Sequence, residues 1–232
     1  MRHTLAELIG FESKSYKHWD PHFVVGLSCF GFAPGAAAFW AVFLCLRESA
    51  DPKDGGVLLQ LVLYPILAVL YTLVVVASYC ADYLFIKRLH RSFYGRVDIA
   101  LASCTFFLSI FDFWLRATIW HTMLLVFIAC SAFVWSGQST SFEIWVWRHT
   151  WWHVVGGGIA LYGALGHLPV PERILMDLPS KLILTEALYG LCIGLFLAGR
   201  HLAGKERLQR LWQSWAVHAN WELRVKRGAA KD

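Results

Sequence analysis

Two long stretches without any charged residue constrain the fold of this chain more than any other feature. Residues His22–Leu46 and Val57–Ala81 contain no Asp, Glu, Lys or Arg. A helix needs about 20 apolar residues to cross a bilayer core of about 30 Å, and each stretch is long enough. We therefore expect both stretches to be transmembrane helices.

Four further segments extend this pattern to a bundle. The composition agrees with a membrane protein, since 57% of the 232 residues are apolar, 16% are charged and the mean hydropathy is +0.50. Twelve Trp, eight Tyr and 16 Phe suit aromatic belts at the two lipid interfaces. We predict an all-α, polytopic membrane helix bundle of about six, at most seven, transmembrane helices. The other expected spans are Val97–Trp114, Ala117–Trp135, Phe142–His167 and Leu182–Gly199.

The charge distribution divides the chain into three parts and predicts its orientation. We expect an N-terminal segment over residues 1–21, a transmembrane domain over 22–200 and a basic amphipathic tail over 201–232. Lys and Arg concentrate in both terminal parts and in the loop around Lys87 and Arg88. Short loops rich in these residues stay in the cytosol, so both termini are expected there. The compartment, endomembrane or plasma membrane, stays open.

The tail interleaves Trp with basic residues. We expect it to lie on anionic lipid headgroups as an amphipathic helix, with a solvated basic tail as the alternative. No nucleic-acid partner is expected. The six cysteines lie in or at the ends of apolar stretches without paired spacing, and are predicted to be small buried apolar residues.

Five polar side chains of the predicted spans are expected to meet at one level of the membrane. Ser78 and Asp82 end the second span on the cytosolic side, and Asp98 begins the third span on that side. His149 and His153 lie near the start of the fifth span, which also leaves the cytosol. Ionisable groups inside a span cost several kcal/mol unless they are paired or solvated, so each is a candidate functional residue.

The spacing of these residues suits a catalytic metal site. His149 and His153 are i, i+4, so both project from one helical face. Two such histidines can bind one zinc ion, and a catalytic zinc needs one further protein ligand and an open position for water. Asp82 can be that ligand. The zinc would activate the water as nucleophile and polarise a carbonyl, as hydrolysis of an amide or ester bond in a lipid requires.

The segment His149–Gly158 resembles the His-x-Trp-Trp-His motif, followed by glycines, in the last spanning helix of alkaline ceramidases. Together with Ser78, Asp82 and Asp98 it is similar to the Ser, Asp and paired-His signature of the CREST superfamily. That superfamily includes alkaline ceramidases, progestin and adipoQ receptors and myomaker-like proteins. The resemblance covers mainly residues 75–162. It implies a shortened seven-helix CREST-like architecture and a zinc-dependent amidase acting on a membrane lipid.

Two differences make the chain a divergent member in this interpretation. Ceramidases and receptors have His four residues after the Ser, where this chain has Asp82. They usually have seven spans, whereas only one span fits here between Asp98 and His149. The site can survive this shortening, because removing two helices keeps the remaining ones in the same direction.

The resemblance implies a role for each residue by analogy. Zinc would be held by Asp82, His149 and His153. Asp98 would orient the water or act as general base, and Ser78 would hydrogen-bond to the water or the oxyanion. In the basic loop, His90 is a substitute ligand if the loop folds back.

Less specific interpretations stay open at this point. The two histidines lie among tryptophans and are alternatively interfacial residues with their polar tips among headgroups, while Asp82 is alternatively a loop residue and Asp98 a helix-start acid. For the whole chain, the first hypothesis is a metal-dependent hydrolase of a membrane lipid, with a sphingolipid such as ceramide as the leading substrate. The alternative is a non-enzymatic receptor or membrane-remodelling scaffold of the same fold.

Two further features are expected to be structural. Asp112 and Arg116 are i, i+4 near the opposite membrane face and are predicted to form an ion pair. The small residues Gly35–Ala38 and Gly156–Gly158 are predicted to mark close contacts between helices.

Overall fold

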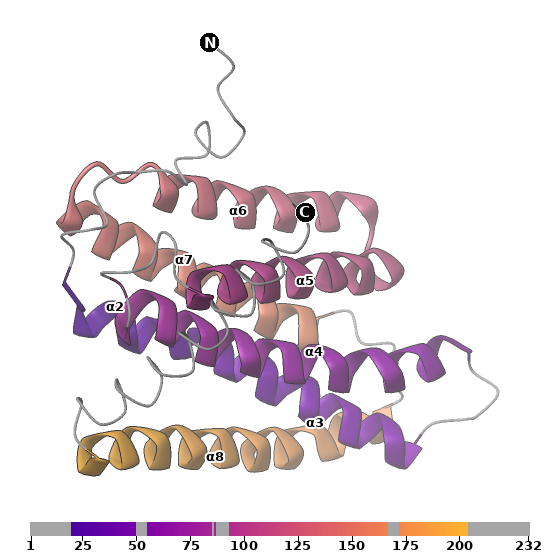
Figure 1. Cartoon of the computed structure of the whole chain (residues 1–232). Coiled ribbons are helices and arrows are strands. Elements are labelled where there is room, and N and C mark those ends of the chain that lie inside the picture. The colour runs from indigo at the N-terminus through magenta and orange to yellow at the C-terminus, as the bar shows by residue number, and fades with distance from the viewer. Residues whose placement is uncertain (1–19, 50–54, 85, 87–92, 167–171, 204–232) are drawn as a thin grey trace, which may run out of the picture.

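The computed structural model describes residues 20–49, 55–84, 86, 93–166 and 172–203, and its long helices lie side by side in one bundle (Figure 1). The first segment consists of three consecutive helices: α2 (Phe23–Ser28), the 3-10 turn η2 (Cys29–Phe32) and α3 (Ala33–Ser49). The later elements are α4 (Gly55–Tyr79) with its π-helical continuation η3 (Cys80–Leu84), α5 (Phe93–Arg116), α6 (Ile119–Gly137), α7 (Phe142–Leu165) and α8 (Glu172–Ala203).

The structure confirms the predicted class of an all-helical membrane bundle. Among the described residues, five helical segments have the length and apolar composition of membrane spans: Phe23–Glu48, Gly56–Leu84, Phe93–Arg116, Ile119–Gly137 and Asp177–Ala198. The other expected span corresponds to α7, which is as long as α5. Helix α7 is not among these five segments, and it carries Glu143, Arg148 and the two candidate histidines.

The largest difference in helix bounds concerns the last helix. Helix α8 begins at Glu172, ten residues before the expected start at Leu182, and continues through Pro179. Helix α4 likewise contains Pro65. A proline inside a helix removes one backbone hydrogen bond, which neighbouring groups in a bundle compensate. The predicted N-terminal segment up to residue 19, His90 and the predicted tail from residue 204 lie outside the described residues.

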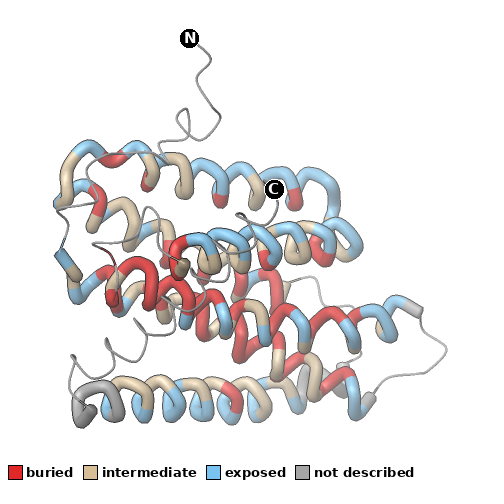
Figure 2. Tube along the Cα trace, in the orientation of Figure 1, coloured by how far each residue is buried: buried red, intermediate tan, exposed pale blue. Residues whose placement is uncertain are grey.

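The core lies where α3, α4 and α7 pack together, and most of the buried positions fall on these helices (Figure 2). Phe39 of α3 stacks on Tyr71 of α4 at a centroid distance of 5.7 Å. Helices α5, α6 and α8 instead expose large apolar side chains, such as Phe107, Phe127 and Ile183. Such exposure is unfavourable in water but is matched by lipid chains, so these helices form the lipid-facing rim.

Glycines bring α7 unusually close to the first helical segment. A Cβ on Gly35 would lie 2.5 Å from the Cβ of Ala160, and a Cβ on Gly157 would clash with the carbonyl oxygen of Gly31. A Cβ on Gly156 would lie 2.7 Å from the Phe32 ring. The predicted role of these small residues is therefore confirmed at these positions, whereas a Cβ on Gly158 would meet nothing within 4 Å.

Arg116 joins the end of α5 to the end of α7. Its guanidinium pairs with Asp112 and also donates to the carbonyl oxygens of Gly163 at 2.7 Å and Gly166 at 3.0 Å. The predicted structural ion pair is confirmed, and it additionally satisfies carbonyl groups that the end of α7 leaves without helical partners.

Candidate metal centre

The end of α4, the start of α5 and the first half of α7 lie at the same end of the bundle (Figure 1). This arrangement follows from the alternating direction of successive spanning helices. It brings Ser78, Asp82, Asp98, His149 and His153 into one region, where specific contacts connect them as two groups.

Asp82 lies between the two candidate histidines. Its Oδ2 atom is 2.9 Å from Nε2 of His149 and 3.5 Å from Nε2 of His153. The two imidazole rings are 4.6 Å apart and roughly perpendicular. Asp82 belongs to the π-helix η3, and such distortions of a helix often occur at functional sites because they redirect side chains.

The burial of these residues excludes the interfacial and loop interpretations. His153 is 1% exposed and Asp82 is 3% exposed. His149 is partly buried and stacks on Trp145 at a centroid distance of 4.7 Å. Polar tips that reached the headgroup layer would be accessible, and a buried carboxylate needs partners. The histidines are those partners.

Ser78 and Asp98 form the second group. The Ser78 hydroxyl donates to Oδ1 of Asp98 at 2.6 Å. Ser78 lies one helical turn before Asp82, so this hydrogen bond joins the start of α5 to the polar end of α4. The structure thus places the Asp98 carboxylate beside the polar centre, and the hydrogen bond holds it by one oxygen.

Cys29 belongs to the centre although its position was not predicted. Its Sγ atom, a carboxylate oxygen of Asp82 and a ring nitrogen of His153 lie within 4.8 Å of one another, and all three residues are buried. These three residues form the one group with metal-ligand spacing among the described residues, and His149 is not part of it. The signal was available in the sequence: the first span runs in the same direction as the third and fifth, so Cys29 in its first half is expected at the same level.

Each histidine contacts a serine through Nδ1, the ring nitrogen that does not face Asp82. Ser28 Oγ is 2.9 Å from Nδ1 of His153, and Ser136 Oγ is 2.8 Å from Nδ1 of His149. The two Nε2 atoms consequently face Asp82. Hydrogen bonds of this kind fix the orientation and tautomer of histidines in metal sites.

The residues present fit a bound metal ion. In tetrahedral zinc sites with bonds of 2.0 to 2.2 Å, neighbouring ligand atoms are about 3.4 Å apart. The 3.5 Å between Asp82 and His153 matches that separation. A thiol, a carboxylate and an imidazole are all donors that zinc accepts. The buried Cys29–Asp82–His153 group could therefore hold a metal ion.

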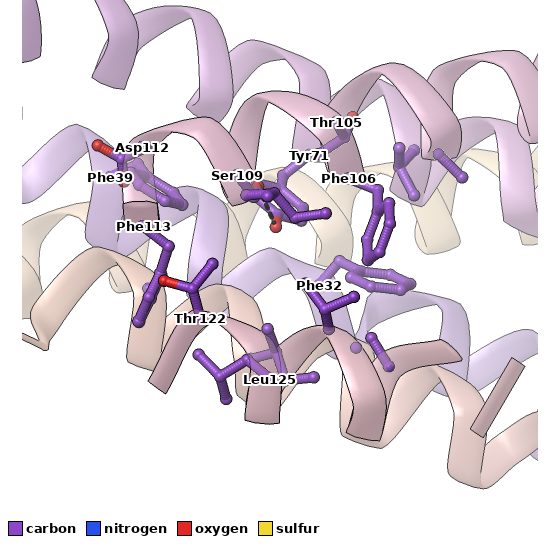
Figure 3. A pocket seen from close by; sticks show the side chains of 18 of the residues that line it. Phe32, Phe39, Tyr71, Thr105, Phe106, Ser109, Asp112, Phe113, Thr122 and Leu125 are labelled. Atoms are coloured by element: carbon purple, nitrogen blue, oxygen red, sulfur yellow. Dashed lines mark hydrogen bonds between the residues drawn. The ribbon is translucent and has the colours of Figure 1, made fainter. Parts of the chain in front are cut away.

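Figure 3 shows an apolar pocket whose lining includes Phe32. Its volume is about 80 Å³, and it lies among α4, α5, α6 and α7. Phe32 lines the pocket and also contacts the His153 ring edge-on at 5.8 Å. On α7 the lining extends from Trp152 to Gly163, which corresponds to roughly 16 Å of helix at 1.5 Å per residue. The pocket is thus elongated along the bundle.

The same pocket borders the lipid-facing surface. Ile110, Thr122 and Val126 line both this pocket and a shallow groove on the outside of α5 and α6. A thin wall of side chains between two lipid-facing helices therefore separates the pocket from the bilayer.

Comparison with known proteins finds no family model, no curated protein and no solved structure that matches this chain.

Proposed function

We propose that this protein is a metal-dependent hydrolase that cleaves an amide or ester bond in a membrane lipid. The observation that carries the proposal is the buried Asp82 carboxylate, which faces two imidazoles inside a membrane bundle, with Phe32 between His153 and an apolar pocket. A membrane protein gains nothing in stability from such a cluster that apolar packing would not supply, so a functional role is the better explanation.

Asp82 and His153 would hold the ion, and zinc suits their donor atoms. A zinc ion there would polarise a substrate carbonyl and activate water at neutral pH. The resemblance to the CREST signature implies His149 as the third ligand, while the geometry offers Cys29. Both ligand sets share the same pair of residues.

Asp98 is the candidate for moving protons in this reaction. Ser78 donates to one of its carboxylate oxygens, and within the described part of the chain the other oxygen has no hydrogen-bond donor, so it would accept a proton from an attacking water. Ser78 acts as a positioning residue in this arrangement, because its hydroxyl proton is committed to Asp98. Its predicted contact with the oxyanion would require that hydrogen bond to break.

The apolar lining of the pocket favours a lipid with an acyl chain as substrate. The chain would lie along α7 while its amide or ester carbonyl reaches the polar centre beside Phe32. A lipid would enter between α5 and α6, where the pocket borders the bilayer. Ceramide and other sphingolipids satisfy this description, and so do simple acyl esters. The proposed CREST relationship favours the amide.

The test is fatty-acid release by the purified full-length protein in lipid micelles supplied with zinc. Ceramide and diacylglycerol would be offered separately, and the product measured by mass spectrometry. We expect release from one of them, and a loss of about 100-fold or more in Asp82→Asn and Asp98→Asn. Asp177→Asn, an exposed residue of α8, and His121→Gln, an exposed residue of α6, are matched controls that keep full activity.

The proposal fails if zinc-loaded protein releases no fatty acid from either lipid, or if Asp82→Asn retains the wild-type rate. Failure with both lipids would leave the non-enzymatic receptor or scaffold as the function to pursue.

A further inference from the structure

We infer that Cys29, together with Asp82 and His153, is a metal ligand, and that His149 is a positioning residue that donates a hydrogen bond to Asp82. The inference rests on the proposed metal-dependent function and replaces the predicted ligand His149 with a cysteine. It follows from the hydrogen-bond partners of the two histidines, which differ.

The partners of Ser28 determine the tautomer of His153. The Ser28 hydroxyl donates its one proton to the carbonyl oxygen of Val25 at 2.8 Å. Ser28 can therefore only accept at its contact with His153, so the proton of a neutral His153 lies on Nδ1. The Nε2 atom then carries a lone pair directed at the Asp82 carboxylate, 3.5 Å away. Two acceptors that face each other in a buried site need a proton or a metal ion between them, and we assign a metal ion because the Cys29 thiol lies within reach of both.

His149 has the opposite arrangement. No carbonyl competes for the Ser136 hydroxyl among the contacts of the described residues, so this hydroxyl can donate to Nδ1 of His149. The proton of His149 then lies on Nε2, which is 2.9 Å from Asp82 Oδ2, a normal length for a donated hydrogen bond. A nitrogen that donates a proton to Asp82 cannot bind a metal at the same time. Its role is to orient a ligating carboxylate.

Cys29 supplies the third ligand. It begins the 3-10 turn η2, where the absence of a side chain on Gly31 lets the chain approach the backbone of His153. Its Sγ lies within 4.8 Å of the ligand atoms of both Asp82 and His153. Without a metal, the thiol donates to the carbonyl oxygen of Val25 at 3.2 Å. A bound divalent ion would deprotonate a coordinating thiol and release it from this contact.

The spectrum of cobalt tests the ligand set directly. The full-length protein would be purified in detergent and loaded with Co²⁺, which takes the place of zinc and gives a near-ultraviolet charge-transfer band when a thiolate binds it. We expect this band in the wild type and in His149→Gln. Cys29→Ser should lose the band and His153→Gln should lose the ion. Glutamine at position 149 retains an N–H donor for Asp82, so we expect its metal affinity to fall by at most about 10- to 100-fold.

Cys80→Ser is the matched control. Cys80 is also buried and lies two residues from Asp82, yet it is outside the metal-compatible group, so its variant should keep the band. The inference is overturned if the wild type binds one equivalent of cobalt without the band, or if His149→Gln loses the ion as completely as His153→Gln. Absence of any bound metal in the wild type would instead overturn the proposed function.

X-ray absorption of the zinc-loaded wild type gives a second measurement that needs no variant. A cysteine ligand produces one sulfur scatterer at about 2.3 Å beside nitrogen and oxygen at about 2.0 to 2.2 Å. A first shell of nitrogen and oxygen alone would contradict the assignment, even if Cys29→Ser fails to fold.

Discussion

Ser28 shows at the scale of one residue how a hydroxyl controls a neighbouring histidine. Because its proton is donated to Val25, its oxygen can only accept from His153. This leaves the other ring nitrogen of His153 unprotonated and directed into the polar centre. Nothing in the hydropathy of the first span indicates such a role, since a serine that donates to a carbonyl within its own helix is common in apolar helices.

Replacement of Ser28 should therefore weaken metal binding without removing a ligand. In Ser28→Ala, the Nδ1 proton of His153 loses its acceptor and the ring is no longer held in one orientation. We expect the metal affinity, measured by competition with a chelator, to fall by about 10- to 100-fold. Ser109→Ala is the control, since it removes a hydroxyl that bonds to Tyr71 away from the centre. Equal affinities of Ser28→Ala and the wild type would show that this hydrogen bond does not orient the ligand.

At the scale of an element, α7 both carries polar site residues and packs closely against neighbouring helices. Its polar face carries His149 and His153, while its glycines allow close approach to η2 and α3. With this polar face, α7 is not among the five segments that have the apolar composition of a membrane span. Close packing against neighbouring helices compensates for this, because helices associate in lipid through van der Waals contact between small residues.

A methyl group at Gly157 should separate these elements. The added Cβ of Gly157→Ala would clash with the backbone of Gly31, so either α7 or η2 has to move. We expect a loss of stability of about 1 to 3 kcal/mol or more, visible as a lower melting temperature in detergent, together with reduced metal content. Gly158→Ala is the matched control, because its Cβ would meet nothing within 4 Å. If Gly157→Ala and Gly158→Ala have the same melting temperature, close packing at Gly157 does not stabilise the bundle.

At the scale of the whole molecule, the direction of successive helices places the polar centre at one end of the bundle. The turn between α6 and α7 lies at this end, and the turn between α5 and α6 lies at the opposite end (Figure 1). The charge distribution predicts that the end with the polar centre faces the cytosol. A lipid substrate would then be processed in the cytosolic leaflet.

Single cysteines in these turns test the orientation. Gln138→Cys lies in the turn after α6, and Ala117→Cys lies in the turn before it. In sealed membranes of known orientation, an impermeant maleimide should label Gln138→Cys from the cytosolic side only and Ala117→Cys from the opposite side only. The unsubstituted protein controls for the native cysteines, which lie within the spans. Labelling of both positions from one side would contradict the predicted topology. Labelling of Ala117→Cys from the cytosolic side and of Gln138→Cys from the opposite side would show that the orientation is the reverse of the predicted one.

The amino-acid sequence alone determined that this chain is a helical membrane bundle. Runs without charge such as Val57–Ala81 have one favourable environment, and hydropathy is a local property that a single segment reveals. The alternating direction of spans then indicated that Ser78, Asp82, Asp98 and the two histidines share one end of the molecule. The exact start of α8 was missed, because a proline at position 179 does not end a helix that neighbouring groups support.

Only the tertiary structure decided which atoms face each other. Cys29 resembled the other apolar cysteines in the sequence, and its place beside Asp82 and His153 depends on how closely α7 packs on η2. The different tautomers of the two histidines depend on serines from two other helical segments. Ligand geometry depends on ångström-scale packing between segments distant in sequence, which no local pattern of residues encodes.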